Sequence, residues 1–343
     1  MKCFFKFALV IMAMLIALTP MYSFAEDIPA ADSKVTGIAI SQPPSVCVYT
    51  EGSDVSTAGM RLLVTYADKS TQTVSSGYTV GRYSKKPGRR TINIYYENQK
   101  APYFVTFKTM SASRLASRVT SSRWNHYSAA EHGWSWAAPY SWVTKYGARY
   151  RMSDKKIYFT FDIGYVNKST WKILDILKKR KVKAIFFTTY PVARDNPKII
   201  KRILADGHLL GNHSTTHGDF AKMSLKSTKK EVLTMHNYVL KKYHYRMEYF
   251  RYPAGCFNKR SLYFMKAIRY KPVFWNFAHY DYNAAAQPAA GPAYRNVVKH
   301  LHSGSIMLLH GQSSTNAKIL DKVITKARSR GYELGQFKTT VFY

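Results

Sequence analysis

The chain has 343 residues, with 52 Lys and Arg against 19 Asp and Glu and a formal net charge of +33. This length allows one large domain and one small domain, with ample sequence for a buried core. The charge points to polyanionic surroundings: nucleic acid for a protein inside the cell, or anionic wall polymers and lipid head groups for an exported one. Because a solvated surface can carry much of this excess, charge alone names no substrate.

Residues 1–25 have the features of a signal peptide. Two lysines precede the twelve apolar residues 7–18, and the segment ends on Ser23-Phe24-Ala25, in which Ser23 and Ala25 supply the small residues that a signal peptidase reads. Twelve residues are too few to span a bilayer comfortably, and no later stretch is long and apolar enough. We therefore expect cleavage after Ala25, no stable transmembrane segment, a secreted protein associated with the cell wall, and no nucleic-acid partner. An uncleaved anchor is the alternative.

Residues 35–109 are predicted to form a small all-β unit. Turn residues separate three strand-like stretches at 38–40, 62–66 and 91–95. The unit resembles the bacterial Ig-like repeats of surface proteins at Val35-Thr36-Gly37-Ile38, Tyr49-Thr50-Glu51-Gly52, Gly59-Met60, Val64-Thr65-Tyr66 and Pro87-Gly88. That resemblance implies a β-sandwich that serves as a spacer or a wall-contact module, without chemistry of its own.

Residues 110–150 are predicted to be a linker and an aromatic-rich lead-in. The stretch 110–123 is rich in Ser, Thr, Ala and Arg, and six Trp and Tyr residues crowd into 124–142 without a clear period. These aromatic side chains could stack on sugar rings, or they could pack the linker onto the following domain.

From about residue 155 the pattern alternates between strands and helices. The predicted strands are 157–161, 184–188, 208–211, 247–250, 272–275 and 305–309. The predicted helices are 170–180, 197–205, 227–242, 259–268, 294–302 and 317–330. Repeated β-then-α units imply parallel strands, and about seven strands indicate a closed or nearly closed barrel.

Reactive side chains directly follow two of these strands. Asp162 comes after 157–161 and Arg251 after 247–250, so both would lie at the mouth of the barrel, where such folds gather their sites. A carboxylate there can act as general base near a metal-bound water, and a guanidinium can hold that carboxylate in one orientation. Taken singly, each has a structural alternative, as a capping aspartate or as a structural ion pair.

Three histidines and a second aspartate complete the candidate site. His213 and His217, at spacing i, i+4, would present two imidazoles to one metal ion if the segment turns helically. The alternative is that they cap and line the start of a helix. Asp281 could hydrogen-bond a ring nitrogen of His310 and raise its pKa, so that a protonated His310 serves as general acid toward a leaving amine.

In this ordered set the chain resembles carbohydrate esterase family 4, the polysaccharide deacetylases with a NodB homology domain. The similarity covers roughly 155–336, and its motifs are Thr160-Phe161-Asp162, His213-Ser214-Thr215-Thr216-His217, Arg251-Tyr252-Pro253-Ala254-Gly255, Asp281 and Ile306-Met307-Leu308-Leu309-His310. The resemblance implies an α/β fold in which residues 151–343 form a distorted (β/α)7-type barrel that removes N-acetyl groups from amino sugars. On that pattern Asp162 is the base, Arg251 orients it, Asp281 tunes the acid His310, and the backbone N–H of Ala254 helps to hold the oxyanion.

The resemblance also implies a divalent metal, with zinc as the expected ion, bound by His213 and His217. It implies substrate contacts from Tyr165, Ala254, Tyr252 and Trp275. The chain departs from the family at Ile163, where most members have a second aspartate as the third metal ligand. Isoleucine has no donor atom, so we expect weaker metal binding than in a full ligand triad.

The branch of the family that deacetylates muramic acid in peptidoglycan also lacks this aspartate. Its motif Asp-Asn-Gly-Tyr corresponds to Asp162-Ile163-Gly164-Tyr165, and Asn167, 211–214 and 273–275 fit as well, although Tyr282 stands where the branch has Trp. Ile163 therefore marks either that branch or an enzyme that has lost its metal. The intact acid, base and arginine argue against a decayed site.

We therefore expect hydrolysis of N-acetyl groups on peptidoglycan glycan strands, with N-acetylmuramic acid as the first candidate. In that branch the freed amine closes to the δ-lactam of spore cortex, which implies sporulation as the setting. The alternatives are an N-acetylglucosamine or chitin-type deacetylase and a catalytically weak wall-binding homologue. Anionic wall polymers are further candidate partners.

Overall fold

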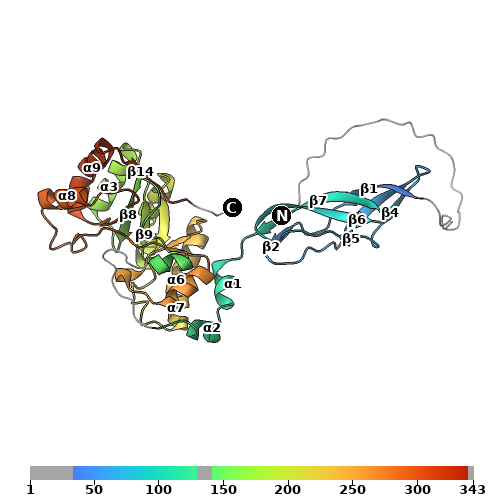
Figure 1. Ribbon diagram of the computed structural model, residues 1–343, viewed down its shortest axis with the longest axis horizontal. Helices are drawn as coiled ribbons and strands as arrows, with labels where there is room; N and C mark the ends of the chain where they lie inside the picture. Colours follow the sequence, from blue (N-terminus) through green and yellow to red (C-terminus); the bar gives the residue numbers. More distant parts are fainter. Residues whose placement is uncertain (1–33, 130–140, 339–343) are drawn as a thin grey trace. The chain divides into compact units, whose positions relative to one another are not determined.

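The computed structural model describes residues 34–129 and 141–338, which form two compact units divided between Met110 and Ser111 (Figure 1). The predicted signal peptide and part of the aromatic-rich segment, residues 130–140, lie outside the described residues. Among the helices of the described ranges, none combines the length and the apolar character needed to cross a membrane.

The first unit contains two β-sheets. One sheet has the order β1 (Val35–Gln42), β3 (Arg61–Tyr66), β4 (Thr71–Val74), and the other has the order β2 (Val48–Thr50), β7 (Gln99–Lys108), β6 (Gly88–Tyr96), β5 (Thr79–Val80). Alternate residues of β7 are buried, as expected for strands with one face toward a core. Leu62 of β3 shares an apolar cluster with Ile92 of β6 and Phe107 of β7, so the two sheets pack face to face.

The second unit is built on a parallel seven-stranded sheet. Its order is β12 (Lys271–Pro272), β11 (Tyr249–Phe250), β10 (Leu209–Asn212), β9 (Ile185–Thr188), β8 (Lys156–Ile163), β13 (Ile306–His310), and β14 (Glu333–Leu334) also pairs with β8. β8 is buried along nearly its whole length, which explains why it reads as a continuous apolar run. The predicted alternation of strands and helices is confirmed.

The two ends of this sheet approach each other through the segment that follows β12. Phe277 bridges Met307 of β13 in parallel, and the N–H of Leu308 donates to the carbonyl of Phe277 at 2.8 Å. The N–H of Asn276 donates to the carbonyl of Ile306 at 3.0 Å. The sheet is therefore curled and nearly closed, and the carboxyl ends of its strands converge on one opening.

Helices cover the outside of the curled sheet. They are α3 (Lys168–Lys179), α4 (Tyr190–Asp195), α5 (Pro197–Ala205), α6 (Leu225–Tyr243), α7 (Lys259–Ala267), α8 (Ala290–Lys299) and α9 (Ser314–Ser329), with the 3-10 turns η1 (Ser141–Tyr146) and η2 (Pro253–Gly255). α3, α8 and α9 lie side by side (Figure 1). Asn167 and Asn258 form capping boxes that fix the starts of α3 and α7.

The segment predicted as a linker contains two short helices, α1 (Ala112–Ser117) and α2 (Ser121–Asn125). Ser111 and Thr120 cap these helices, since each side chain accepts a hydrogen bond from a backbone N–H three residues later. The segment predicted as a linker therefore contains regular helical structure. Trp124 is buried in the core of the second unit, so this part of the aromatic cluster packs against protein.

Candidate active site

A cavity of about 400 Å³ lies at the carboxyl ends of the parallel strands. Its lining includes seven of the predicted site residues: Asp162, His213, His217, Tyr252, Ala254, Trp275 and His310. Asp162, the penultimate residue of β8, lies directly beside His310 of β13, because the two are partners in the register of the parallel pair. Strand pairing therefore places the predicted base and the predicted acid on one rim.

The Asp162 carboxylate is held by Arg251. Nη1 of Arg251 donates to Oδ1 of Asp162 at 3.0 Å and to Oγ1 of Thr160 at 2.8 Å. Nε donates to the carbonyl of Val273 at 3.0 Å, and the guanidinium stacks over the ring of Phe187. Arg251 is fully buried, so the pair forms in a low-dielectric surrounding and the carboxylate is fixed in one orientation.

His213 lies beside the same carboxylate. Its Nε2 is 3.6 Å from Oδ2 of Asp162, and its Nδ1 is 2.9 Å from the carbonyl oxygen of Arg251. A carbonyl only accepts, so Nδ1 carries the proton and the Nε2 lone pair faces the cavity. Burial lowers the pKa of His213 to about 4, which keeps this ring neutral at neutral pH.

The segment that carries the two histidines is a loop, so the helical turn on which the i, i+4 argument was conditional is not formed. Ser214 and His217 both have left-handed backbone conformations, with φ of 72° and 60°. The loop nevertheless brings the rings of His213 and His217 together, with their centroids 4.9 Å apart. The two histidines are therefore neighbours because of the loop conformation and not because of a helical turn.

Glu231 of α6 holds this loop, a role that was not predicted from the sequence. Its Oε2 accepts the backbone N–H groups of Thr215 and Thr216 at 3.0 and 2.8 Å, and its Oε1 accepts the Thr216 hydroxyl at 2.8 Å. The available signal was an acidic residue on the otherwise buried, largely apolar face of a helix, where a carboxylate is rarely placed without partners.

The side chains of this site that could hold a divalent metal are two imidazoles, those of His213 and His217. The Nε2 lone pair of His213 is available, and His217 lies against it, whereas Ile163 is fully buried in the apolar core. Gly311 packs closely on Ile163, since an added Cβ at Gly311 would lie 2.8 Å from Cγ1 of Ile163. Within residues 34–129 and 141–338, no cluster of three or more His, Cys, Asp or Glu side chains could hold a metal ion.

His310 is paired with Asp281 behind the cavity. Oδ1 of Asp281 lies 2.8 Å from Nδ1 of His310, and Oδ2 accepts the His310 backbone N–H at 2.8 Å. Burial alone would lower the pKa of His310, but the hydrogen bond to Asp281 and its charge outweigh burial and raise it. For Asp281, burial opposes ionisation, yet the hydrogen bonds from His279 and His310 hold its pKa well below the usual value.

Two further residues support Asp281 and were not identified from the sequence. The side-chain amide of Asn316 donates to Oδ2 of Asp281, and Oδ1 of Asn316 lies 3.1 Å from Nε2 of His279. That His279 nitrogen is also 3.4 Å from Oδ2 of Asp281. Asp281 is thus a fully buried carboxylate surrounded by donors, which explains why it stays ionised.

The remaining predicted residues differ in their position relative to the cavity. Ala254 lines it and has a left-handed conformation with φ of 49°, while Tyr252 and Trp275 form apolar wall. The Tyr252 hydroxyl and the Trp275 Nε1 have no hydrogen-bond partner among the described residues although both are buried. Tyr165 is exposed and is not part of the lining, in contrast to its neighbour Gly164.

Comparison with known proteins agrees with this geometry. Residues 149–273 match the polysaccharide deacetylase family. The peptidoglycan-N-acetylmuramic acid deacetylase PdaA of Bacillus subtilis is 36% identical over 205 residues, which are 59% of this chain and 78% of that protein. A peptidoglycan-N-acetylglucosamine deacetylase of Bacillus cereus is 29% identical over 203 residues, which are 57% of this chain and 72% of that protein.

Two solved structures extend the comparison to the fold. The structure of Bacillus subtilis PdaA has a TM-score of 0.57 and 33% identity, and the match covers 60% of this chain and 95% of that one. A family 4 carbohydrate esterase from Bacillus anthracis has a TM-score of 0.53 and 34% identity, with coverage of 61% and 95%.

Proposed function

The chain belongs to the polysaccharide deacetylase family, whose members are carbohydrate de-N-acetylases, and we propose that its substrate is peptidoglycan. This proposal rests mainly on two carboxylate-centred pairs that flank one cavity, Asp162 with Arg251 and Asp281 with His310. Such pairs separate the two proton-transfer roles that amide hydrolysis needs, because one supplies a fixed base and the other a protonated acid.

In the proposed mechanism Asp162 takes a proton from the attacking water. Arg251 occupies Oδ1 of Asp162, so Oδ2 is the oxygen that would receive this proton. The backbone N–H of Ala254, in its left-handed turn at the cavity wall, would stabilise the oxyanion of the tetrahedral intermediate. His310 would then protonate the departing amine from Nε2, since Nδ1 is bound to Asp281.

We propose that His213 and His217 hold a divalent cation in this site, with zinc as the first candidate. When bound, the cation would supply Lewis-acid chemistry beside the Asp162 carboxylate. With two imidazoles and no donor at Ile163, the affinity should be lower than in a three-ligand site. Titration calorimetry of the wild type against His213→Ala measures this directly, and equal affinity in the two proteins would reject the assignment.

The amino sugar is proposed to be N-acetylmuramic acid, with δ-lactam formation and sporulation as the implied setting. The support is the similarity to PdaA and the absence of the third acidic ligand at Ile163. N-Acetylglucosamine is the second candidate, supported by the Bacillus cereus relative. Tyr252 and Trp275, which line the cavity, are the side chains that would contact the sugar.

The test of this proposal is mass analysis of peptidoglycan that has been incubated with the purified protein and digested to muropeptides. We expect loss of acetyl groups located on muramic acid by fragmentation. Loss from glucosamine alone would assign the enzyme to the second candidate, and an unchanged digest would contradict peptidoglycan as the substrate.

We also propose that the protein acts outside the cytoplasm at the cell wall, with the first unit as an Ig-like spacer or wall-contact module. The support is the leader-like composition of residues 1–25 and the two packed sheets of the first unit. N-terminal sequencing of the protein from culture should find a start after Ala25, and a retained leader in the mature protein would contradict export with cleavage.

A further inference from the structure

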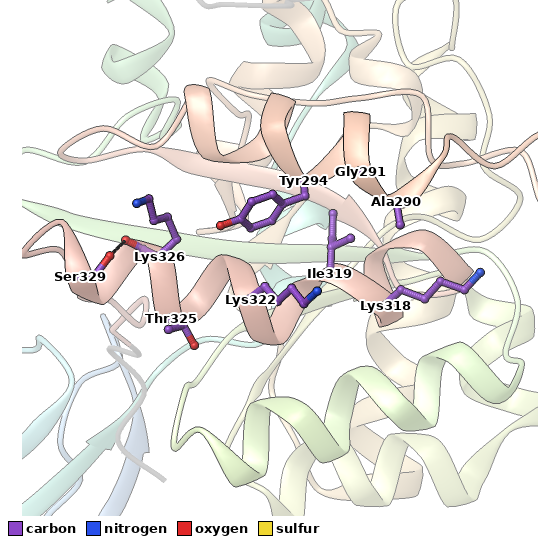
Figure 2. Close-up of a pocket in the computed structure, with 9 residues that line it drawn as sticks. All are labelled: Ala290, Gly291, Tyr294, Lys318, Ile319, Lys322, Thr325, Lys326 and Ser329. Atoms are coloured by element: carbon purple, nitrogen blue, oxygen red, sulfur yellow. Dashed lines mark hydrogen bonds between the residues drawn. The ribbon is translucent and has the colours of Figure 1, made fainter.

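A second hollow lies on the outside of the barrel, between α8 and α9. Its volume is about 540 Å³, and it shares no lining residue with the catalytic cavity. Figure 2 shows Tyr294 of α8 reaching toward α9 and forming one wall. Ile319 of α9 is buried beneath the floor. We call this feature the α8/α9 groove.

Three lysines follow the α9 side of the groove at every fourth residue. They are Lys318, Lys322 and Lys326, called here the lysine row, and all three are exposed (Figure 2). Residues four apart lie on one helical face, with about 6 Å of axial rise between them. The groove therefore carries a line of like charges with an even spacing.

No acid neutralises this row within the parts of the chain that the structure describes. None of the three ammonium groups makes a hydrogen bond or an ion pair there. Asp321 is the single acid of α9, and its carboxylate is bound by Arg180 near the end of α3, on another face of the helix. On the α8 side Nη1 of Arg295 lies beside Gly291, which adds a fourth cation at the rim.

The geometry points to the α8/α9 groove as a binding site for one strand of a phosphodiester-linked anionic polymer of the teichoic acid type. Ammonium groups are compact point charges that suit phosphates, and their even spacing suits a polymer with a charge in every repeat. The half-buried ring of Tyr294 offers apolar contact to the carbon segments between phosphates. A single half-buried tyrosine is no stacking platform for successive bases, which disfavours single-stranded nucleic acid.

The groove and the active site are joined by one helix. α9 begins four residues after His310, and Lys318 is two residues from Asn316, which donates to Asp281. A polymer bound along the lysine row would therefore hold the catalytic opening at a fixed distance from the wall. This biological placement rests on the proposed function, whereas the binding itself does not.

The test measures binding of fluorescently labelled poly(glycerol phosphate) to the full chain by anisotropy over a series of salt concentrations. The groove variant combines Lys318→Gln, Lys322→Gln and Lys326→Gln, because glutamine keeps helix propensity and removes charge. The control variant combines Lys226→Gln, Lys230→Gln and Lys241→Gln, which removes the same charge from exposed positions of α6. Release of acetate from a soluble fragment is followed in parallel.

We expect the groove variant to lose at least about tenfold in affinity, and its slope of log K against log salt to fall by about 2, since each single-strand phosphate contact contributes roughly 0.7. The control variant should bind nearly as the wild type does, and acetate release should be equal in all three proteins. Equal losses of affinity in the groove variant and the control variant would show that the polymer binds through the overall positive charge, and would contradict a binding site in the α8/α9 groove. Tighter groove binding of single-stranded DNA with the same number of phosphates would also overturn it. Absence of acetate release from all three proteins would instead contradict the proposed function.

Discussion

Replacement of Asp281 by asparagine isolates the charge that tunes His310. In the wild type Oδ1 faces Nδ1 of His310, while Oδ2 accepts from the His310 N–H and from Asn316. An amide can keep its oxygen toward only one of these sides. If the oxygen stays with the two donors, the new NH₂ group faces Nδ1, which must then lose its proton. The ring is left neutral, with its one proton on Nε2.

The size of the effect follows from the hydrogen bond that is lost. A hydrogen bond to a charged group is worth about 1.5–3 kcal/mol, and 1.36 kcal/mol corresponds to a tenfold change in rate. Asp281→Asn should therefore lower kcat by roughly 10- to 150-fold at neutral pH. Because the charge of Asp281 raises the pKa of His310, the variant should have a lower His310 pKa. Activity needs protonated His310, so the alkaline limb of the pH profile should move to lower pH.

The same substitution changes stability with a defined sign. The folded pKa of Asp281 is lowered, so its stabilising effect is present above about pH 4 and is lost as the pH falls through the folded value. The folded pKa of His310 is raised, so its effect is present below about pH 6.5 and is lost as the pH rises through the folded value. The two proteins should therefore differ most in free energy of unfolding between about pH 4 and 6.5.

The assay combines pH profiles of acetate release with an NMR titration of the His310 ring in wild type and variant. Asp154→Asn is a matched control, because Asp154 is an exposed carboxylate that bonds Tyr158 and does not line the cavity. An unchanged His310 titration in Asp281→Asn, together with an unchanged alkaline limb, would refute the tuning role.

Substitutions at three further positions test how the site is held. Arg251→Lys removes the planar guanidinium that bonds both Asp162 and the Val273 carbonyl. We expect urea unfolding to show a loss of about 1–3 kcal/mol in the free energy of unfolding, and kinetics to show a fall of about 100-fold in kcat. Wild-type values of both would contradict the positioning role of Arg251. Glu231→Ala leaves the Thr215 and Thr216 N–H groups without their acceptor and should weaken cation binding in calorimetry. Glu231→Gln keeps an oxygen that can accept these hydrogen bonds, so its cation affinity should stay close to that of the wild type. Equal affinities of the two variants would contradict the role of Glu231 in holding the histidine loop. Gly211→Ala would place a Cβ 2.3 Å from the Phe187 ring, so thermal unfolding should show a loss of about 1–3 kcal/mol in the free energy of unfolding. An unchanged unfolding midpoint would show that β9 and β10 can move apart without cost.

The sequence predicted the elements whose signals are local. α5 has the predicted bounds 197–205, because Pro197 opens the helix and Asp206-Gly207 ends it. β11 and β12 are shorter than predicted, because the chain leaves the β12 edge of the sheet after Pro272 and continues to β13. The course of this segment depends on closure of the barrel, which the local sequence does not show. α4 and β14 were not predicted at all, because each is short and depends on tertiary contacts.

For the site, position at a strand end, the order of the motifs and the family resemblance together predicted Asp162, Arg251 and His310, and in the structure Arg251 holds Asp162 while Asp162 and His310 line one cavity. The residues that support them act across long sequence separations. Glu231 is 15 or 16 residues from the N–H groups that it accepts, and Asn316 is 35 residues from Asp281. Such contacts carry no periodic signal, so they become visible only in the folded chain.

The proposed mechanism requires Asp162 to act as the base of a peptidoglycan de-N-acetylase. It is tested most directly by the rate of acetate release from purified peptidoglycan by the wild type and by Asp162→Asn, with circular dichroism to confirm that both proteins are folded. We expect steady release by the wild type and a loss of at least about 100-fold in the folded variant. Equal release by the two proteins would contradict the assignment of Asp162 and the mechanism built on it.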